Sequence, residues 1–196
     1  MLPSMRGILG GTFDPPHVAH LVAAETAYRQ CELEVVTFVP AGAPWQKAGA
    51  SVSAAKHRWE MTQRAIDGVG YFDADDREVR REGWTYTIDT LESFGGGEEI
   101  TLLLGADAAR GVPTWHRFEE VLERTTIAVV PRPGVERDEV DGILGVPVVW
   151  LDMPALDVCG TMLRERVGSG ESIRFLVRDA VWEYVRDQGL YRAANA

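Results

Sequence analysis

The sequence predicts an α/β fold with a doubly wound parallel sheet, and three observations lead to this class. Apolar runs rich in β-branched residues recur along the chain, as in strands buried on both faces of a sheet. Amphipathic, helix-like stretches separate these runs, as in a parallel sheet covered by helices. A length of 196 residues with 45% hydrophobic residues suits one domain with a substantial core. We therefore expect a single domain over residues 1–196, with an α/β core at 6–155 and a helical C-terminal segment at 156–196.

Strands and helices are expected in alternation along this domain. The strands come from these apolar runs: RGILG near Arg6, EVVTFV from Glu34, EITLLL from Glu99, TTIAVV from Thr125 and VPVVWL from Val146. The helices are expected to begin near Val18, Ser53, Thr87, Phe118 and Thr161, with a last one over Asp179 to Gln188. Ser53 and Thr87 suit N-cap positions, and Gly189 suits the residue that follows the last helix.

Charge and cysteine content restrict the partners and the compartment. The net charge of -10 repels nucleic acid and anionic membranes. Runs such as ITLLL are far too short to cross a bilayer, and the opening residues MLPSMRG lack the apolar stretch of a signal peptide. Cys31 and Cys159 lie far apart and outside any CxxC spacing, which suits a reducing compartment. We expect a cytoplasmic protein with no nucleic-acid or membrane partner, and a homo-oligomer stays open.

The loop after the first strand is the first candidate site. Ligands of open parallel sheets bind at the carboxyl ends of the strands, which here means the loops after Leu9, Val39, Leu104 and Val130. The first of these loops reads GGTFDPPH, and a helix is expected to begin at or near His17. Glycines let the backbone approach a ligand, and a helix start offers N–H groups and positive dipole to phosphate. The spacing is neither GxGxxG nor GxxxxGK[ST], so the usual dinucleotide and P-loop interpretations do not apply.

Two histidines follow this loop. His17 and His20 are spaced i and i+3, so both imidazoles lie on one face of the first helical turn and can address one ligand. A zinc site would need a third ligand, which the sequence does not place, so no metal ligand is assigned. From the residues alone, the two histidines are equally explained as surface or capping groups.

The segment that contains the first loop and the two histidines resembles a motif of a known family. GGTFDPPHVAH resembles the (H/T)xGH signature of the nucleotidyltransferase superfamily, in the form GGTFDPxHxGH typical of bacterial nicotinate-nucleotide adenylyltransferases. Further segments resemble that family in the same order: VPAGAPWQK, SAAKHRWEM, GWTYTIDTL, LGADAARGVPTWHRFEEV, DVCGTMLRERV and SIRFLVRDAVWEYVRDQGLY. The likeness covers most of the chain and implies a Rossmann-like sheet of the HxGH nucleotidyltransferase type.

The resemblance implies an enzyme that joins the AMP part of ATP to nicotinate mononucleotide, releasing pyrophosphate, in NAD synthesis. The catalytic residues would be His17, His20, Lys47 and Arg164. The phosphates and the rest of ATP would contact Gly10, Gly11, Thr12, Phe13, Thr161 and Arg132. Mg²⁺ would accompany ATP as the cofactor, offsetting phosphate charge, with no firm protein ligand.

The acceptor, nicotinate mononucleotide, would bind a second group of residues. Trp115 would stack on the pyridine ring, backbone N–H groups of Tyr86, Thr87 and His116 would meet its carboxylate, and the Asp107 carboxylate would contact the nucleotide. Without the resemblance, each would have an ordinary explanation: Lys47 and Arg164 as surface cations, Trp115 as a core aromatic, Asp107 as a helix cap.

Two departures from the family pattern bear on activity. Ala19 replaces the glycine of HxGH, and Cys159 and Gly160 replace the paired serines of ISST, so two hydroxyl donors are lost while Thr161 remains. The backbone N–H groups of a helix start survive both changes, so ATP binding is expected to weaken without being abolished.

Three alternatives stay open. The same chemistry could act on nicotinamide mononucleotide or on phosphopantetheine, because backbone donors separate a carboxylate from a carboxamide only in part. The chain could also be a nucleotide-binding regulator that has lost catalysis through the change at Cys159 and Gly160. An NAD-dependent oxidoreductase is disfavoured, because the first loop lacks the required glycine spacing.

Overall fold

The computed structural model describes residues 4–43, 52–95 and 97–192. Its centre is a parallel sheet of six strands in the order β3-β2-β1-β4-β5-β6. The strands are β1 (Ser4–Gly11), β2 (Val35–Pro40), β3 (Phe72–Ala74), β4 (Glu98–Gly105), β5 (Thr125–Val130) and β6 (Val148–Trp150). The order reverses between β1 and β4, which pair along their lengths at the middle of the sheet. This confirms the doubly wound parallel sheet.

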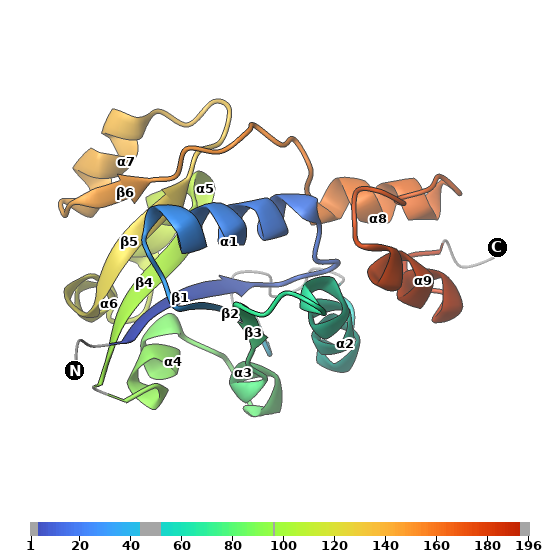
Figure 1. Ribbon diagram of the computed structural model, residues 1–196, viewed down its shortest axis with the longest axis horizontal. Coiled ribbons are helices and arrows are strands. Elements are labelled where there is room, and N and C mark those ends of the chain that lie inside the picture. The colour runs from blue at the N-terminus through green and yellow to red at the C-terminus, as the bar shows by residue number, and fades with distance from the viewer. Residues whose placement is uncertain (1–3, 44–51, 96, 193–196) are drawn as a thin grey trace.

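Helices cover both faces of the sheet, and Figure 1 shows α1 on one side and α4 on the other. The helices are α1 (Val18–Gln30), α2 (Ala55–Ile66), α3 (Arg77–Arg80), α4 (Thr87–Ser93), α5 (Ala106–Gly111), η2 (Val112–Thr114), α6 (Phe118–Arg124), α7 (Arg137–Leu144), α8 (Gly160–Gly168) and α9 (Asp179–Asp187). No helix in the described ranges is long and apolar enough to cross a membrane.

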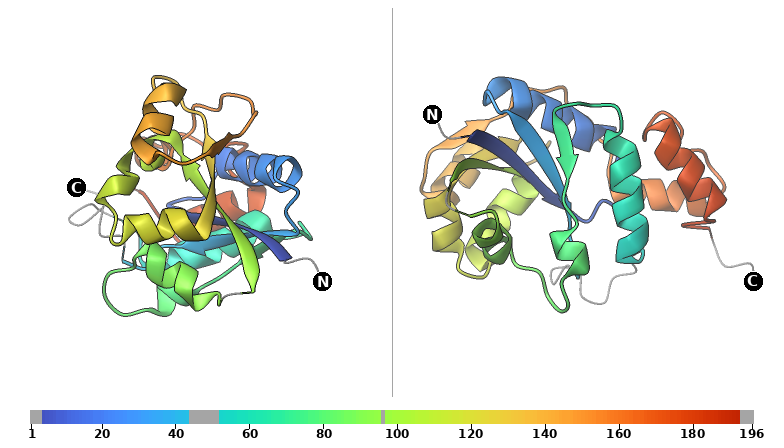
Figure 2. Two further views of the ribbon diagram at one scale, coloured as in Figure 1. Left: turned by 90° about the vertical axis from the view of Figure 1, so that its left-hand side faces the viewer. Right: turned by 60° about the horizontal axis from the view of Figure 1, so that its bottom comes forward.

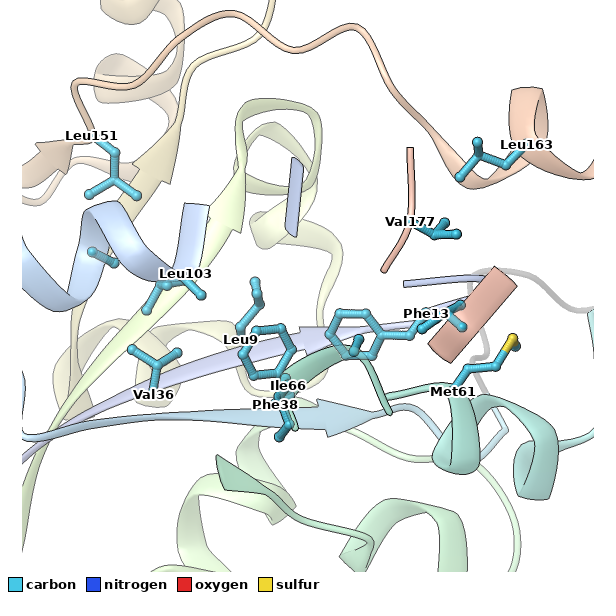
Figure 3. Close-up of a cluster of buried hydrophobic side chains, with 14 of the residues drawn as sticks. Leu9, Phe13, Val36, Phe38, Met61, Ile66, Leu103, Leu151, Leu163 and Val177 are labelled. Atoms are coloured by element: carbon cyan, nitrogen blue, oxygen red, sulfur yellow. The ribbon is translucent and has the colours of Figure 1, made fainter. Parts of the chain in front are cut away.

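Each face of the sheet has its own apolar core, because successive residues of a strand point to opposite faces. On β1, Leu9 belongs to the core beneath α1 and α2, whereas Ile8 belongs to the core beneath α4, α5, α6 and α7. Figure 3 shows part of the first core, where Phe13 lies between Phe38 and Met61. The strand sequences are therefore apolar at consecutive positions, as the sequence predicted.

The C-terminal helices α8 and α9 extend the first core beyond the carboxyl ends of the strands. Leu163 of α8 and Val181 and Val185 of α9 are buried in the same cluster as Leu9. Figure 2 shows these helices beside α2 at one end of the molecule. His57 of α2 and Tyr184 of α9 are joined there by a 2.9 Å hydrogen bond.

Several elements differ from the sequence prediction. β3, α3, α5 and α7 were not expected, and β6 is shorter than the run VPVVWL. The N-cap of α2 is Ala54 and not Ser53, and the N-cap of α4 is Tyr86, so Thr87 is its first helical residue. Ser53 has another task, since its N–H binds Asp14 and its carbonyl binds Arg58. Gly189 follows α9 with a φ of 62°, as expected of the residue after a helix.

Candidate active site

The first loop is held in place by Phe13. This side chain is 1% exposed and packs against the Phe38 ring, with centroids 5.7 Å apart. Its backbone has a φ of 50°, an uncommon conformation for a residue with a side chain. A Cβ on Gly11 would lie 3.0 Å from the Phe13 ring, whereas a Cβ on Gly10 would meet nothing within 4 Å. Gly11 thus makes room for the buried ring, and Gly10 presents open backbone at the strand end.

The two histidines stack on each other where this loop enters α1. Their ring centroids are 3.8 Å apart, and Nδ1 of His20 accepts a 3.2 Å hydrogen bond from the backbone N–H of His17. A neutral His20 therefore carries its proton on Nε2. His17 is 6% exposed. Burial, aided by the positive charge of Arg132, lowers the pKa of His17 to about 4, so this ring is neutral at pH 7.

Arg164 approaches the same loop from α8. Its Nη1 donates a 2.8 Å hydrogen bond to the carbonyl of Asp14, and Nη2 donates to the hydroxyl of Thr161 at 3.2 Å. Thr161 is exposed at the start of the helix. Arg166, two residues on, instead forms a 2.9 Å ion pair with Glu171. Of the two arginines, only Arg164 adjoins the first loop.

Asp14 is a buried anchor that sequence reasoning missed. Its carboxylate accepts two hydrogen bonds, from the N–H of Ser53 at 3.1 Å and from the phenol of Tyr191 at 2.6 Å. Burial, and the nearby carboxylate, raise the pKa of Tyr191, so the phenol stays a donor. The partners are 39 and 177 residues away in sequence, so no local pattern reveals them.

A cavity of about 240 Å³ adjoins the first loop and lies beside β1 and β4. Its walls are apolar where the strands contribute and polar where the loops do. The lining residues are Ile8, Gly10, Gly11, Thr12, Val39, Ala41, Glu78, Thr85, Tyr86, Thr87, Thr90, Leu91, Leu102, Leu104, Ala108, Trp115 and His116. The structure therefore brings together all the residues predicted for the acceptor except Asp107, and joins them to Gly10, Gly11 and Thr12.

Aromatic side chains form one wall of this cavity. The rings of Tyr86 and His116 lie 4.8 Å apart, and Trp115 is half-buried beside them. The indole N–H of Trp115 is buried and has no hydrogen-bond partner within residues 4–43, 52–95 and 97–192. Thr87 begins α4, where the first N–H groups lack partners inside the helix. The wall thus combines flat apolar surface with donors, as an aromatic acid requires.

Glu78 is a cavity residue that the sequence did not predict. Its Oε1 accepts a 2.6 Å hydrogen bond from the hydroxyl of Thr90. Burial raises the pKa of Glu78, although hydrogen bonds from Thr90 and Thr85 oppose the rise. The Glu78 carboxyl group thus binds α4 through the hydroxyl of Thr90. No motif around GWTYTIDTL predicts this contact.

Asp107 and Arg132 lie outside the cavity and contact each other. Their side chains form a 2.8 Å ion pair, and each is about half exposed, at 53% and 51%. The sequence prediction assigned Asp107 to the acceptor and Arg132 to ATP, and the structure brings the two side chains together at the ends of β4 and β5. Arg132 is close enough to His17 to lower its pKa.

Two further sequence predictions concern Lys47 and metal binding. Lys47 lies outside the described residues. Within the described ranges, no three His, Cys, Asp or Glu side chains gather as a metal site.

The departure at Gly160 has a clear structural setting. A Cβ at this position would lie 3.0 Å from the carbonyl oxygen of Asp14 and 3.2 Å from Nη1 of Arg164. The absence of a side chain lets the start of α8 approach the first loop while Arg164 keeps its bond to Asp14. Ala19 lies half-buried in the first turn of α1.

Comparisons relate the chain to known proteins. Residues 8–166 match the cytidylyltransferase-like family. A protein of Oceanobacillus iheyensis named "Probable nicotinate-nucleotide adenylyltransferase" is 40% identical over 188 residues, covering 94% of this chain and 95% of the relative. A protein of the same name from Pseudomonas syringae pv. tomato is 38% identical, with coverage of 99% and 96%. In fold, the chain resembles the Plasmodium falciparum nicotinic acid mononucleotide adenylyltransferase complexed with NaAD, with a TM-score of 0.80 at 18% identity, over 96% of this chain and 97% of that one.

Proposed function

Since this chain belongs to the cytidylyltransferase-like family, and within it to the nicotinate-nucleotide adenylyltransferases, we propose that it transfers AMP from ATP to nicotinate mononucleotide. The products are nicotinate adenine dinucleotide and pyrophosphate, in a step of NAD synthesis. One observation supports this most strongly. The cavity walled by Trp115, Tyr86 and His116 ends at Gly10, Gly11 and Thr12, the loop that leads into the stacked histidines.

The chemistry is a single displacement at phosphorus. An oxygen of the acceptor phosphate forms a bond to the α-phosphorus of ATP, and the bond from that phosphorus to the bridging oxygen of the β-phosphate breaks. Pyrophosphate leaves with the electron pair, and no covalent enzyme intermediate forms. The protein contributes alignment of the two phosphates and stabilisation of the charge that develops on them.

In this proposal the two histidines act as hydrogen-bond donors. His17 is neutral at pH 7 because of its burial, so it serves as a dipole and not as a cation. His20 offers Nε2–H, because its Nδ1 accepts from the backbone of His17. Donors fixed in advance stabilise a developing oxyanion without reorganising. Arg164, and Lys47 by its place in the family motif, supply positive charge.

The acceptor would occupy the cavity with its ring against Trp115. Backbone N–H groups at Tyr86, Thr87 and His116 would receive the nicotinate carboxylate, at the polar wall of the cavity. Asp107 and Arg132 form an ion pair above the strand ends, and one or both would meet the nucleotides after that pair opens.

Mg²⁺ would be the accompanying ion, bound to phosphate oxygens and neutralising their charge. Arg164 and the two histidines lie on the loop side of the site, where they would contact phosphate oxygens not used by the ion. We place the reaction in the cytoplasm, because both cysteines, Cys31 and Cys159, are free thiols and suit a reducing compartment.

Pyrophosphate release tests the proposal directly. Purified protein would be incubated with ATP and Mg²⁺, and with nicotinate mononucleotide, nicotinamide mononucleotide or phosphopantetheine in separate reactions. We expect release that depends on the acceptor and is fastest with nicotinate mononucleotide. A clear preference for nicotinamide mononucleotide would overturn the substrate assignment. No release with any acceptor would favour a nucleotide-binding regulator that has lost catalysis.

A further inference from the structure

Arg58 is a cation buried in the middle of the protein. It lies on α2 with an exposed fraction of 1%, and it is among the largest fully buried side chains. It shares the buried face of the helix with Met61, Thr62 and Ala65. A buried charge is costly unless hydrogen bonds replace its water, so its partners indicate what it does.

Those partners are three main-chain carbonyls from separate segments. Nε donates to Ser53 at 2.9 Å, Nη1 to Thr12 at 3.0 Å and Nη2 to Gly42 at 2.7 Å. Each nitrogen of the guanidinium thus holds a different segment, through three of the five N–H donors of the planar group. Burial lowers the pKa of Arg58, and the carboxylates of Asp14 and Glu78 partly oppose this effect through space.

The three segments meet between the first loop and the cavity. Thr12 belongs to the first loop and lines the cavity. Gly42 follows β2, and a Cβ at this position would clash with the backbone carbonyl of Glu78. Ser53 precedes α2, and its N–H binds the Asp14 carboxylate. Arg58 therefore connects the loop that carries the histidines with the backbone beside a cavity residue.

The bond to Thr12 also sets the direction of a backbone donor. The Thr12–Phe13 peptide is trans, so its carbonyl and its N–H point in opposite directions. Fixing the Thr12 carbonyl on Arg58 aims the Phe13 N–H away from the buried guanidinium. Phe13 itself sits at a φ of 50°, a backbone conformation that the surroundings must maintain.

We propose that Arg58 is a positioning residue for adenylyl transfer, fixing the Thr12–Phe13 peptide, Gly42 and Ser53 so that the two substrate sites keep their mutual geometry. The inference rests on the proposed function and deepens it. Arg58 is buried and touches neither substrate. It acts through the backbone that surrounds them, where small displacements weaken an in-line reaction strongly.

A charge-conserving substitution separates this role from a simple need for positive charge. Lysine at this position keeps the cation but has one nitrogen, so it cannot reach three carbonyls that the guanidinium reaches with three. Arg6 provides a matched control, because it also makes three hydrogen bonds, to Glu98 and Thr37, but at the opposite ends of the strands. The comparison is therefore Arg58→Lys against Arg6→Lys.

Kinetics and amide hydrogen exchange are measured together on both variants. We expect kcat of Arg58→Lys, per folded molecule and at saturating substrates, to fall roughly tenfold or more, as for a displaced reacting group. The KM for nicotinate mononucleotide should change less, because the apolar and aromatic walls remain. Exchange of the peptide covering residues 10–17 should accelerate, while Arg6→Lys keeps kcat and the exchange of that peptide.

Arg58→Gln covers the case in which the lysine variant does not fold. It removes the buried charge, and with it the desolvation cost, while its single amide nitrogen cannot replace three guanidinium nitrogens that each bond a different carbonyl. The same loss of kcat and the same faster exchange at residues 10–17 are expected. A kcat within about twofold of wild type in the folded variant would overturn the inference, on the scale of a neutral substitution.

The two proposals fail in different ways. If wild type releases no pyrophosphate, the proposed function fails, while faster exchange confined to residues 10–17 would still support Arg58 as the group that orders the loop. If wild type is active and Arg58→Lys loses activity only in proportion to its unfolded fraction, the positioning role is refuted and the function stands.

Discussion

Tyr191, near the end of the described chain, donates a 2.6 Å hydrogen bond to the carboxylate of Asp14 in the first loop. Asp14 is 3% exposed, and its backbone carbonyl receives Arg164 of α8. The segment after the sheet is thereby joined to the loop at the head of α1. Arg164 of α8 and Tyr191, which follows α9, therefore both hold the first loop in place.

The first prediction concerns this bond. Tyr191→Phe should lower the free energy of unfolding by about 1.5–3 kcal/mol, the range for a hydrogen bond to a charged group. Urea unfolding measures the loss. Tyr184→Phe, which removes a phenol bonded to His57 on the far side of α2, should cost less. Equal losses in both variants would show that the bond from Tyr191 to Asp14 stabilises the fold no more than the bond between Tyr184 and His57.

The second prediction concerns His20. His20→Ala should reduce kcat by roughly two decades or more, corresponding to about 3 kcal/mol for a lost transition-state donor. The fold should change little, since the ring lies at the loop surface of α1 and is only half-buried. His57→Ala is the control, because His57 bonds Tyr184 away from the cavity. Wild-type turnover in His20→Ala would remove this ring from the mechanism.

The third prediction separates two arginines on α8. Arg164→Ala should lower kcat/KM for ATP by roughly a hundredfold, as for a lost charged donor to phosphate. Arg166→Ala should leave it nearly unchanged, because Arg166 is committed to Glu171. Steady-state kinetics with varied ATP makes the comparison. Similar losses in the two variants would point to a general effect on α8.

The fourth prediction concerns the acceptor wall. Trp115→Ala should raise the KM for nicotinate mononucleotide by roughly tenfold or more, since ring stacking on an aromatic side chain is worth about 1–3 kcal/mol. Trp84, which is 49% exposed and does not line the cavity, supplies the matched control in Trp84→Ala. An unchanged KM in Trp115→Ala would place the pyridine ring elsewhere.

The fifth prediction concerns pH and His17. The folded protein holds the pKa of His17 at about 4, whereas an unfolded histidine has about 6.5, so the unfolded chain binds more protons between these values. Stability should therefore fall as the pH falls from 6.5 towards 4, by about 2 kcal/mol from this group between pH 7.5 and 5.

His17→Gln isolates this contribution. Thermal and urea unfolding of both proteins would be compared across the same pH range, so that the carboxyl groups they share cancel. The variant should lose less stability than wild type as the solution is acidified. Parallel curves would mean that His17 is not kept neutral by its burial.

The sheet was predictable because the sequences of its central strands are recognisable without knowledge of their neighbours. The runs ending in Leu9, Val39, Leu104 and Val130 are apolar at consecutive positions, as burial on both faces demands. β3 was missed because Phe72–Ala74 is too short for a period and has an aspartate at its centre. In α7, Gly142 and the acidic residues obscured the spacing of Val140 and Leu144, which are its buried residues.

The candidate site was predictable where motif residues supply it and not where contacts across the chain do. His17, His20 and the cavity wall come from segments with recognisable sequences. Asp14, Tyr191 and Glu78 depend on partners that only the folded chain brings near. Arg58 could have been noticed in one way. It lies three residues before Met61, on the apolar face of α2, where a charged side chain is unusual unless it has hydrogen-bond partners.

Gly160 limits how this enzyme can be recombined with its relatives. A serine Cβ there would lie 3.0 Å from the Asp14 carbonyl oxygen and 3.2 Å from Nη1 of Arg164, so these neighbours would have to shift by a few tenths of an ångström. A graft of the serine-bearing segment from another family member would have to bring its own spacing between α8 and the first loop. Engineers who exchange parts between such enzymes should therefore transfer these two segments as one unit.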